Sequence, residues 1–106
     1  MKGASDNADL TVQEREILRH LCCTSQAARE AGLRRLASYR FSLPLHQVIY
    51  GALCELASAN STLAPHALSA RLTLRGFPDV DTDALFQPAE NPEALEALIA
   101  RVTALR

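Results

Sequence analysis

Residues 44–58, PLHQVIYGALCELAS, carry the clearest helical pattern in the chain. Apolar side chains recur there at spacings of three and four residues, which places them along one face of an α-helix. This face is formed by Leu45, Val48, Ile49, Ala52, Leu53 and Leu56. Pro44 suits the first turn of a helix, because the backbone N–H at that position has no intrahelical partner. We therefore predict an amphipathic helix over 44–58 at the centre of a hydrophobic core.

Two helices are predicted on the amino-terminal side of this segment. Thr11 and Glu14 match the capping box, in which each side chain satisfies a backbone group at the start of a helix, so we expect a helix over 12–23. Its inward residues are Ile17, Leu18, Leu21 and Cys22. The Thr-Ser pair at 24–25 can cap a second helix over 26–38. The apolar stripe of that helix is weaker and consists of Ala28, Ala31, Leu33 and Leu36.

On the carboxyl-terminal side, prolines and turn residues separate the helices. Pro65 opens a helix that we expect to end at Gly76, in the left-handed conformation that closes many helices. Asp81 is expected to cap a short helical turn, which Pro88 interrupts. The Asn-Pro pair at 91–92 repeats the start signal for a final helix. The inward residues of these segments are Ala67, Leu68, Leu72, Leu85, Phe86, Leu95, Leu98, Ile99 and Val102.

The composition agrees with an all-α fold. The chain has 106 residues, the size of one domain, and its apolar residues are mainly alanine and leucine, with three Phe, two Tyr and no Trp. Alanine and leucine favour helices, whereas strands are rich in β-branched and aromatic residues. We predict a compact orthogonal bundle of five to six short helices over 10–106 and a disordered tail at 1–9, which is small and polar.

Several classes of location and cofactor are not expected. Residues 1–9 lack the apolar core of a signal peptide, and no later apolar run approaches the ~20 residues of a membrane-spanning helix. We expect a soluble, cytoplasmic protein without membrane contact. The odd set of Cys22, Cys23 and Cys54 contains no CxxC pair, and we interpret these cysteines as small buried hydrophobes in a reducing compartment.

No pattern of catalytic residues is present. The chain has four scattered glycines, a single lysine and no nucleophile-elbow sequence, so neither a phosphate-binding loop nor a hydrolase triad is indicated. The acids at 79–83 alternate as in a calcium loop, but the required glycine and bidentate glutamate do not follow. The sequence His-Leu-Cys-Cys at 20–23 lacks a fourth zinc ligand. We predict a protein that is not an enzyme, with no catalytic residues, cofactor, metal or small-molecule substrate.

The charges are distributed unevenly along the chain. Residues 10–40 contain six Arg and three Glu, whereas 77–96 contain six acids and no base. Such asymmetry can steer a partner onto one face, but it falls short of the basic stripe of a nucleic-acid-binding protein. We therefore expect a protein partner rather than direct contact with nucleic acid. The candidate contact residues are Arg34, Arg35 and Arg40.

The string at 39–56, YRFSLPLHQVIYGALCEL, resembles a segment of the amino-terminal domain of DnaB-type replicative helicases. The family pattern of a Phe, a His, an Ile with an aromatic, and spaced aliphatics is matched by Phe41, His46, Ile49, Tyr50, Leu53 and Leu56. The similarity extends over residues 12–77, and the helicase-binding carboxyl-terminal domain of bacterial primase shows a similar hydrophobic order. The chain departs from the helicase pattern at 77–81, Phe-Pro-Asp-Val-Asp, which puts the family's dimerisation hairpin in doubt.

The resemblance implies a bacterial DnaB amino-terminal-domain-like fold and a scaffold role in DNA replication. The implied partners are the replicative helicase, the primase, or a second copy in a homodimer. An alternative is a small helical DNA-binding transcriptional regulator, because two short helices joined at 24–25 are similar to a helix-turn-helix. Against it, residues 27–32 contain alanines and a glycine where polar base-reading residues are needed.

Overall fold

The computed structural model describes residues 3–59, 63–87 and 95–105. Within these ranges the chain forms six α-helices and no strand, which confirms the predicted all-α bundle. The helices are α1 (Gly3–Cys23), α2 (Gln26–Arg35), α3 (Pro44–Ser58), α4 (Pro65–Leu74), α5 (Thr82–Leu85) and α6 (Leu95–Leu105). None of the described helices is long and apolar enough to cross a membrane.

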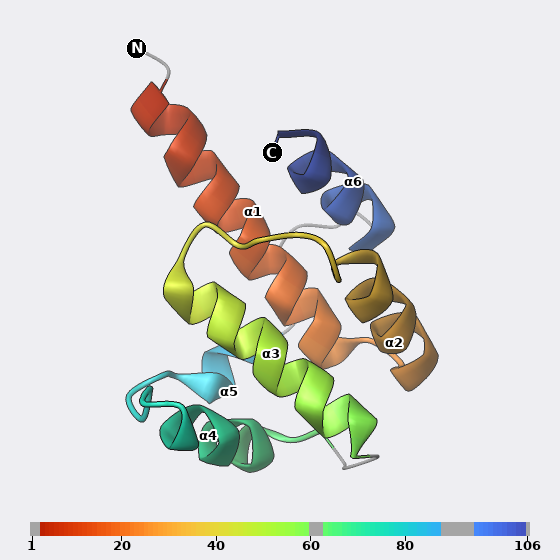
Figure 1. Cartoon of the computed structure of the whole chain (residues 1–106), viewed down its shortest axis with the longest axis vertical. Helices are drawn as coiled ribbons and strands as arrows, with labels where there is room; N and C mark the ends of the chain where they lie inside the picture. The colour runs from red at the N-terminus through yellow and green to blue at the C-terminus, as the bar shows by residue number, and fades with distance from the viewer. Residues whose placement is uncertain (1–2, 60–62, 88–94, 106) are drawn as a thin grey trace.

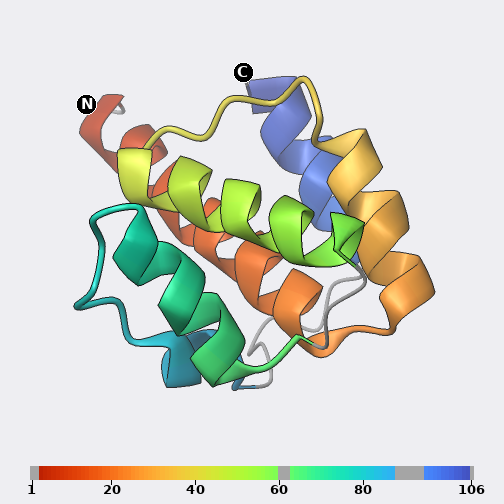
Figure 2. The ribbon, with the colours of Figure 1, turned by 60° about the horizontal axis from the view of Figure 1, so that its bottom comes forward.

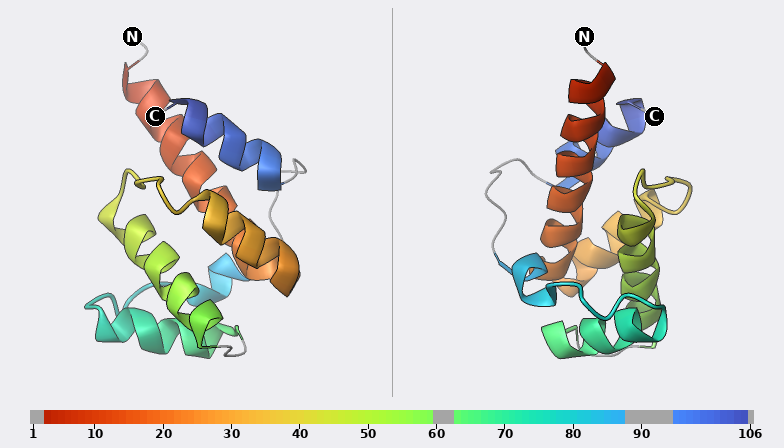
Figure 3. Two further views of the ribbon diagram at one scale, coloured as in Figure 1. Left: turned by 45° about the vertical axis from the view of Figure 1, so that its right-hand side comes forward. Right: turned by 90° about the vertical axis from the view of Figure 1, so that its left-hand side faces the viewer.

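The bundle is organised around α1, which crosses the molecule diagonally (Figure 1). Helices α2 and α6 lie on one side of it, and α3, α4 and α5 lie on the other, as the turned views in Figures 2 and 3 show. Helix α1 contacts α2, α3, α5 and α6, while α4 joins the bundle through α3 and α5. The molecule measures 42 × 28 × 26 Å along its principal axes.

The core lies between α1 and the helices on both of its sides. As predicted, α3 buries Ile49, Ala52, Leu53 and Leu56, whereas its Leu45 and Val48 are half-buried at the edge. The other helices contribute to one continuous apolar cluster that includes Ile17, Leu18, Leu21, Leu33, Leu36, Leu68, Leu72, Leu85, Leu98, Ile99 and Val102. Burial of this cluster is the main force that holds the short helices together, because helices of this length are marginal in isolation.

Helix α4 is closed by a left-handed turn at Gly76, as the sequence predicts. Gly76 has a φ of 91°, in the left-handed region that glycine adopts without a steric penalty. The N–H of Phe77 donates to the carbonyl of Leu72 at 2.8 Å, and the N–H of Gly76 donates to that of Thr73 at 3.1 Å. This pair of bonds is the Schellman motif. It turns the chain sharply toward α5.

Two predicted amino-terminal caps are confirmed. The Oγ of Ser25 accepts from the N–H of Ala28 at 3.3 Å at the start of α2. The carboxylate of Asp81 accepts from the N–H of Ala84 at 3.2 Å at the start of α5. Each side chain satisfies a backbone donor that the first turn of a helix leaves unpaired. The Asn-Pro start predicted for the final helix at 91–92 lies outside the described residues.

The first helix begins earlier than predicted. Residues 3–9, expected to belong to a disordered tail, are the first turns of α1, so Thr11 is not its cap. The segment from Ala4 to Asp9 contains no proline or further glycine to interrupt a helix. Glu14, predicted as the capping-box partner, lies instead on the buried face of α1.

The second helix ends earlier than predicted, at Arg35 instead of residue 38. The N–H of Ala37 donates to the carbonyl of Arg34 at 3.2 Å, so the chain tightens into a turn over 36–38. The turn directs Tyr39 back into the protein. Ala28, predicted to face inward, is exposed, because it borders an open cleft between α2 and α6.

Gly32 allows α2 to approach its neighbours closely. A Cβ atom at this position would lie 3.0 Å from Leu21 Cδ2 and 3.1 Å from Leu95 Cδ2, so it would meet α1 and α6 at once. Gly51, by contrast, has only ordinary contact at 3.9 Å with the guanidinium of Arg75. The two helix glycines therefore differ in how much space surrounds them.

We predict that Gly32→Val lowers the free energy of unfolding by about 2 kcal/mol, because the added methyl groups would press into Leu21 and Leu95. Gly51→Ala is the matched control and should raise it by about 0.5–1 kcal/mol, since alanine is the better helix former. Urea unfolding followed by circular dichroism measures both changes. Equal stability of Gly32→Val and the unmodified chain would contradict this account of the packing.

Candidate functional site

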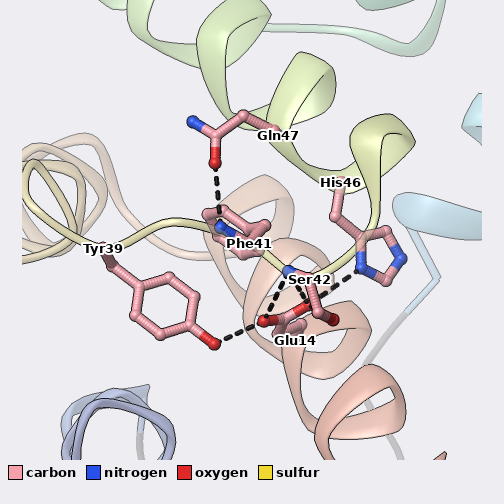
Figure 4. Close-up of polar contacts among 6 residues, drawn as sticks. All are labelled: Glu14, Tyr39, Phe41, Ser42, His46 and Gln47. Atoms are coloured by element: carbon pink, nitrogen blue, oxygen red, sulfur yellow. Dashed lines mark hydrogen bonds and ion pairs between the residues drawn. The ribbon is translucent and has the colours of Figure 1, made fainter. Parts of the chain in front are cut away.

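A buried carboxylate lies at the centre of the molecule. Glu14, on α1, has an exposed fraction of 0%. Its carboxylate accepts hydrogen bonds from the hydroxyl of Tyr39, from the backbone N–H of Ser42 at 3.1 Å and from the Oγ of Ser42 at 2.8 Å. The Nδ1 of His46 lies 3.4 Å from Oε1. Figure 4 shows these groups gathered around the carboxylate.

The partners of Glu14 come from the connection between α2 and α3 and from the first turn of α3. The Phe41 N–H in this connection donates to Oε1 of Gln47 at 2.9 Å. The Phe41 ring packs edge-on against Tyr39, with centroids 5.0 Å apart, and lies 5.6 Å from the ring of Tyr50. The connection between α2 and α3 is therefore held in place by hydrogen bonds to the Glu14 carboxylate and by the ring contacts of Phe41. An ionised carboxylate without such partners would be strongly destabilising at this depth.

The Glu14 carboxylate faces one nitrogen of His46, Nδ1. An ionised carboxylate only accepts hydrogen bonds, so a neutral His46 that bonds to Glu14 does so through a protonated Nδ1. In that tautomer the other nitrogen, Nε2, is an acceptor. His46 is only 6% exposed, and its Nε2 has no hydrogen-bond partner among the described residues. In Figure 4 this nitrogen points away from Glu14.

His46 also lines a groove of about 630 Å³. The groove lies between α1, the start of α3, and the turn over 76–81 that leads into α5. Its apolar lining consists of Leu43, Leu45, Ile49, Phe77, Pro78, Val80, Ala84 and Leu85. We call it the α1–α3–α5 groove. Its size falls within the roughly 300–1,000 Å³ typical of ligand pockets.

The borders of the α1–α3–α5 groove carry opposite charges. Arg15 lies on the border formed by α1, and Asp79 and Asp81 lie on the border formed by the turn before α5. All three are exposed. Arg15 and Asp79 form no ion pair within the described part of the chain, and the Asp81 carboxylate caps α5. The groove therefore presents a positive border and a negative border that do not neutralise each other.

The predicted contact residues lie elsewhere. Arg34, Arg35 and Arg40 are all exposed, but none of them lines the α1–α3–α5 groove. Arg34 borders a cleft of about 370 Å³ between α2 and α3, and Arg35 borders one of about 270 Å³ between α2 and α6. Arg40 lies in the connection between α2 and α3. The structure therefore does not gather the three arginines into one pocket.

Sequence reasoning missed both Glu14 and the groove. The available signal was that Glu14 occupies the same helical face as Ile17, Leu18 and Leu21, at spacings of three, four and seven residues. A charged residue on such a face requires buried partners. The partner of His46 is Glu14, which lies far away in the sequence.

The cysteines divide into different environments. Cys22 is buried as predicted, and burial, followed by the neighbouring Cys23, raises the pKa of its thiol to about 12. A thiol with so high a pKa is a poor nucleophile at neutral pH. The prediction that Cys23 is buried is wrong: it is exposed at the end of α1, with Sγ 3.5 Å from the carbonyl oxygen of Gln87. Among the described residues, no group of three or more side chains is placed to hold a metal ion.

Comparison with family models, with curated proteins and with solved structures finds no match for this chain. The resemblance to the amino-terminal domain of DnaB-type helicases therefore stays a prediction from the sequence.

We predict that Glu14→Ala lowers the free energy of unfolding by about 3 kcal/mol, because the hydroxyl, amide and imidazole donors around it would lose their common acceptor. Glu96→Ala, at an exposed position of α6, is the control and should change it by less than about 0.5 kcal/mol. Chemical unfolding of both variants measures the difference. Similar stabilities for the two variants would show that the Glu14 network contributes little.

The tautomer of His46 can be observed directly. We expect a long-range ¹H–¹⁵N correlation spectrum at neutral pH to show Nδ1 protonated and Nε2 bare, because Nδ1 faces the Glu14 carboxylate. His66, exposed in the first turn of α4, serves as the internal reference for a solvated histidine. A proton on Nε2 instead would contradict the assignment of that nitrogen as the acceptor in the groove.

Proposed function

We propose that the chain is a non-catalytic protein-interaction domain whose docking surface is the α1–α3–α5 groove. The observation that carries the proposal is the groove itself, an apolar hollow of about 630 Å³ that His46 helps to line. Nε2 of His46 has no hydrogen-bond partner among the described residues, so it is available to a bound partner. A few polar groups in a largely apolar hollow are typical of binding sites.

The apolar walls of the groove support the same proposal. Leu43, which lines the groove, is 39% exposed, and Leu45 and Phe77 are half-buried along its walls. Large apolar side chains that border a hollow are typical of interaction sites when polar residues surround them. A docked segment would cover them and gain the free energy of removing their surface from water.

A catalytic use of the Glu14–His46 pair has less support. A carboxylate that orients a histidine is also found in hydrolases, but there the second ring nitrogen contacts a nucleophile. Thr11 is the single hydroxyl residue that lines the α1–α3–α5 groove, and no hydroxyl or thiol of the described residues is bonded to Nε2. The donors around Glu14 serve instead to fix the connection between α2 and α3.

The resemblance supplies the proposed partners. On the pattern at 39–56, the partner would be the replicative helicase or the primase, or a second copy of the chain, and the role would be that of a scaffold in DNA replication. The uneven charge of the groove borders supports a specific protein partner, because complementary charges set orientation and association rate.

One observation favours a second candidate function. Arg34, Arg35 and Arg40 are exposed and make no side-chain hydrogen bond or ion pair within the described residues, as a contact to a phosphate backbone would require. However, the first turn of α2 exposes Ala27 and Ala28, which carry no base-reading group. This surface would therefore support nonspecific DNA contact rather than the sequence recognition of a regulator. A salt-dependent shift in the mobility of duplex DNA, lost on replacing these arginines, would establish it.

We predict that the purified chain binds either the replicative helicase or the primase of its host. In interferometry, Arg15→Glu should weaken that binding at least about tenfold, or about 1.4 kcal/mol, because it removes the positive border of the groove. Arg40→Glu is the matched control: it makes the same charge change at an exposed arginine outside the groove and should retain the affinity. Light scattering of the free chain tests self-association in the same samples.

Two results would overturn parts of the proposal. If neither protein binds and the chain stays monomeric, the replication partners are wrong. If binding occurs but Arg40→Glu weakens it and Arg15→Glu does not, the docking surface is the exposed arginine face and not the groove.

A further inference from the structure

We infer that the α1–α3–α5 groove recognises a bipolar segment of a partner protein. This segment places an apolar side chain in the groove, donates a hydrogen bond to Nε2 of His46, and carries an acidic residue toward Arg15 and a basic residue toward Asp79. The inference rests on the proposed function, but it concerns the chemistry of the occupant and does not depend on which protein supplies it.

The occupant must donate a hydrogen bond because of how His46 is held beside Glu14. The carboxylate receives bonds from Tyr39 and from both donors of Ser42, and it faces Nδ1 of His46. In the tautomer with Nδ1 protonated toward Glu14, the imidazole presents its lone pair to the groove. A carboxylate or phosphate at this point would face another acceptor and be repelled. An indole, amide, hydroxyl or backbone N–H would satisfy the nitrogen.

The occupant must carry both an acid and a base because the borders of the groove carry opposite charges. Arg15 on α1 and Asp79 on the turn line the hollow from two different segments and form no ion pair with each other. A segment of one charge sign would be attracted at one border and repelled at the other. A segment with an acid at one end and a base at the other is attracted at both, and only in one direction.

The apolar lining determines what lies between these charges. Leu45, Ile49, Phe77 and Leu85 line the groove, and Ile49 and Leu85 also belong to the hydrophobic core. Their surfaces are held by the packing of α3 and α5, so the groove is a preformed feature of the fold. A preformed apolar site admits a side chain without the cost of reordering the protein.

The test is a selection from a library of displayed short peptides on the full chain. The expected peptides share an apolar residue, a donor residue such as Trp, Asn, Ser or Lys, and one acidic and one basic end. Selection on Arg15→Glu should exchange the acidic end for a basic one, and selection on Asp79→Lys should exchange the basic end for an acidic one. Peptides without this order, or with the same order on all three proteins, would overturn the inference.

Two histidine variants test the hydrogen bond. The amide of His46→Asn reproduces the donor toward Glu14 but does not reach the position of Nε2, so the selected peptides should bind at least about tenfold more weakly, while thermal unfolding stays close to that of the unmodified chain. The longer amide of His46→Gln reaches that position and can offer an acceptor, and it should restore part of the affinity. Equal binding to all three proteins would overturn the role of Nε2.

A second copy of the chain as the occupant would give a different result from a partner peptide. If light scattering shows a dimer that Arg15→Glu dissociates, the occupant is another copy of the chain and the inference of a partner peptide is wrong. If the bipolar peptides bind but helicase and primase do not, the chemistry of the groove is right and the proposed replication partners are wrong.

Discussion

The buried carboxylate of Glu14 is the constraint on which the other features of this fold depend. A charge inside a hydrophobic bundle is tolerated only where hydrogen-bond donors surround it. Tyr39 and Ser42 are those donors, and both lie in the connection between α2 and α3. That connection must therefore return across α1, which explains why α2 ends at Arg35 and why α3 begins where it does.

The same constraint shapes the candidate site. His46 lies in the first turn of α3, and its Nδ1 lies 3.4 Å from the Glu14 carboxylate, which orients the ring. The turn over 76–81 forms another wall of the groove, because the left-handed Gly76 reverses the chain after α4. The site thus combines a histidine that the core holds in place with charged residues exposed at the border. Interaction surfaces commonly have this division between a fixed centre and an adaptable rim.

Much of the fold was predictable because its signals are local. The periodicity of α3, the cap at Asp81 and the stop at Gly76 depend on neighbouring residues, and all three predictions are confirmed. Thr11 and Glu14 were misinterpreted for a related reason. Their spacing fits a capping box, and only the approach of Tyr39 and His46, distant in sequence, shows that Glu14 is a buried acceptor. The groove was not predictable, because its borders come from three separate segments.

The residues that carry the helicase resemblance differ from those that would select a partner. Phe41, Ile49 and Leu53 are buried in the core, and His46 belongs to the Glu14 network. Such positions report how a bundle packs, and helical domains with different partners can share them. Residues 77–81, where the chain departs from the helicase pattern, form one wall of the groove and its negative border. The segment in which the chain differs from the helicase pattern is therefore the one that the proposed partner would contact.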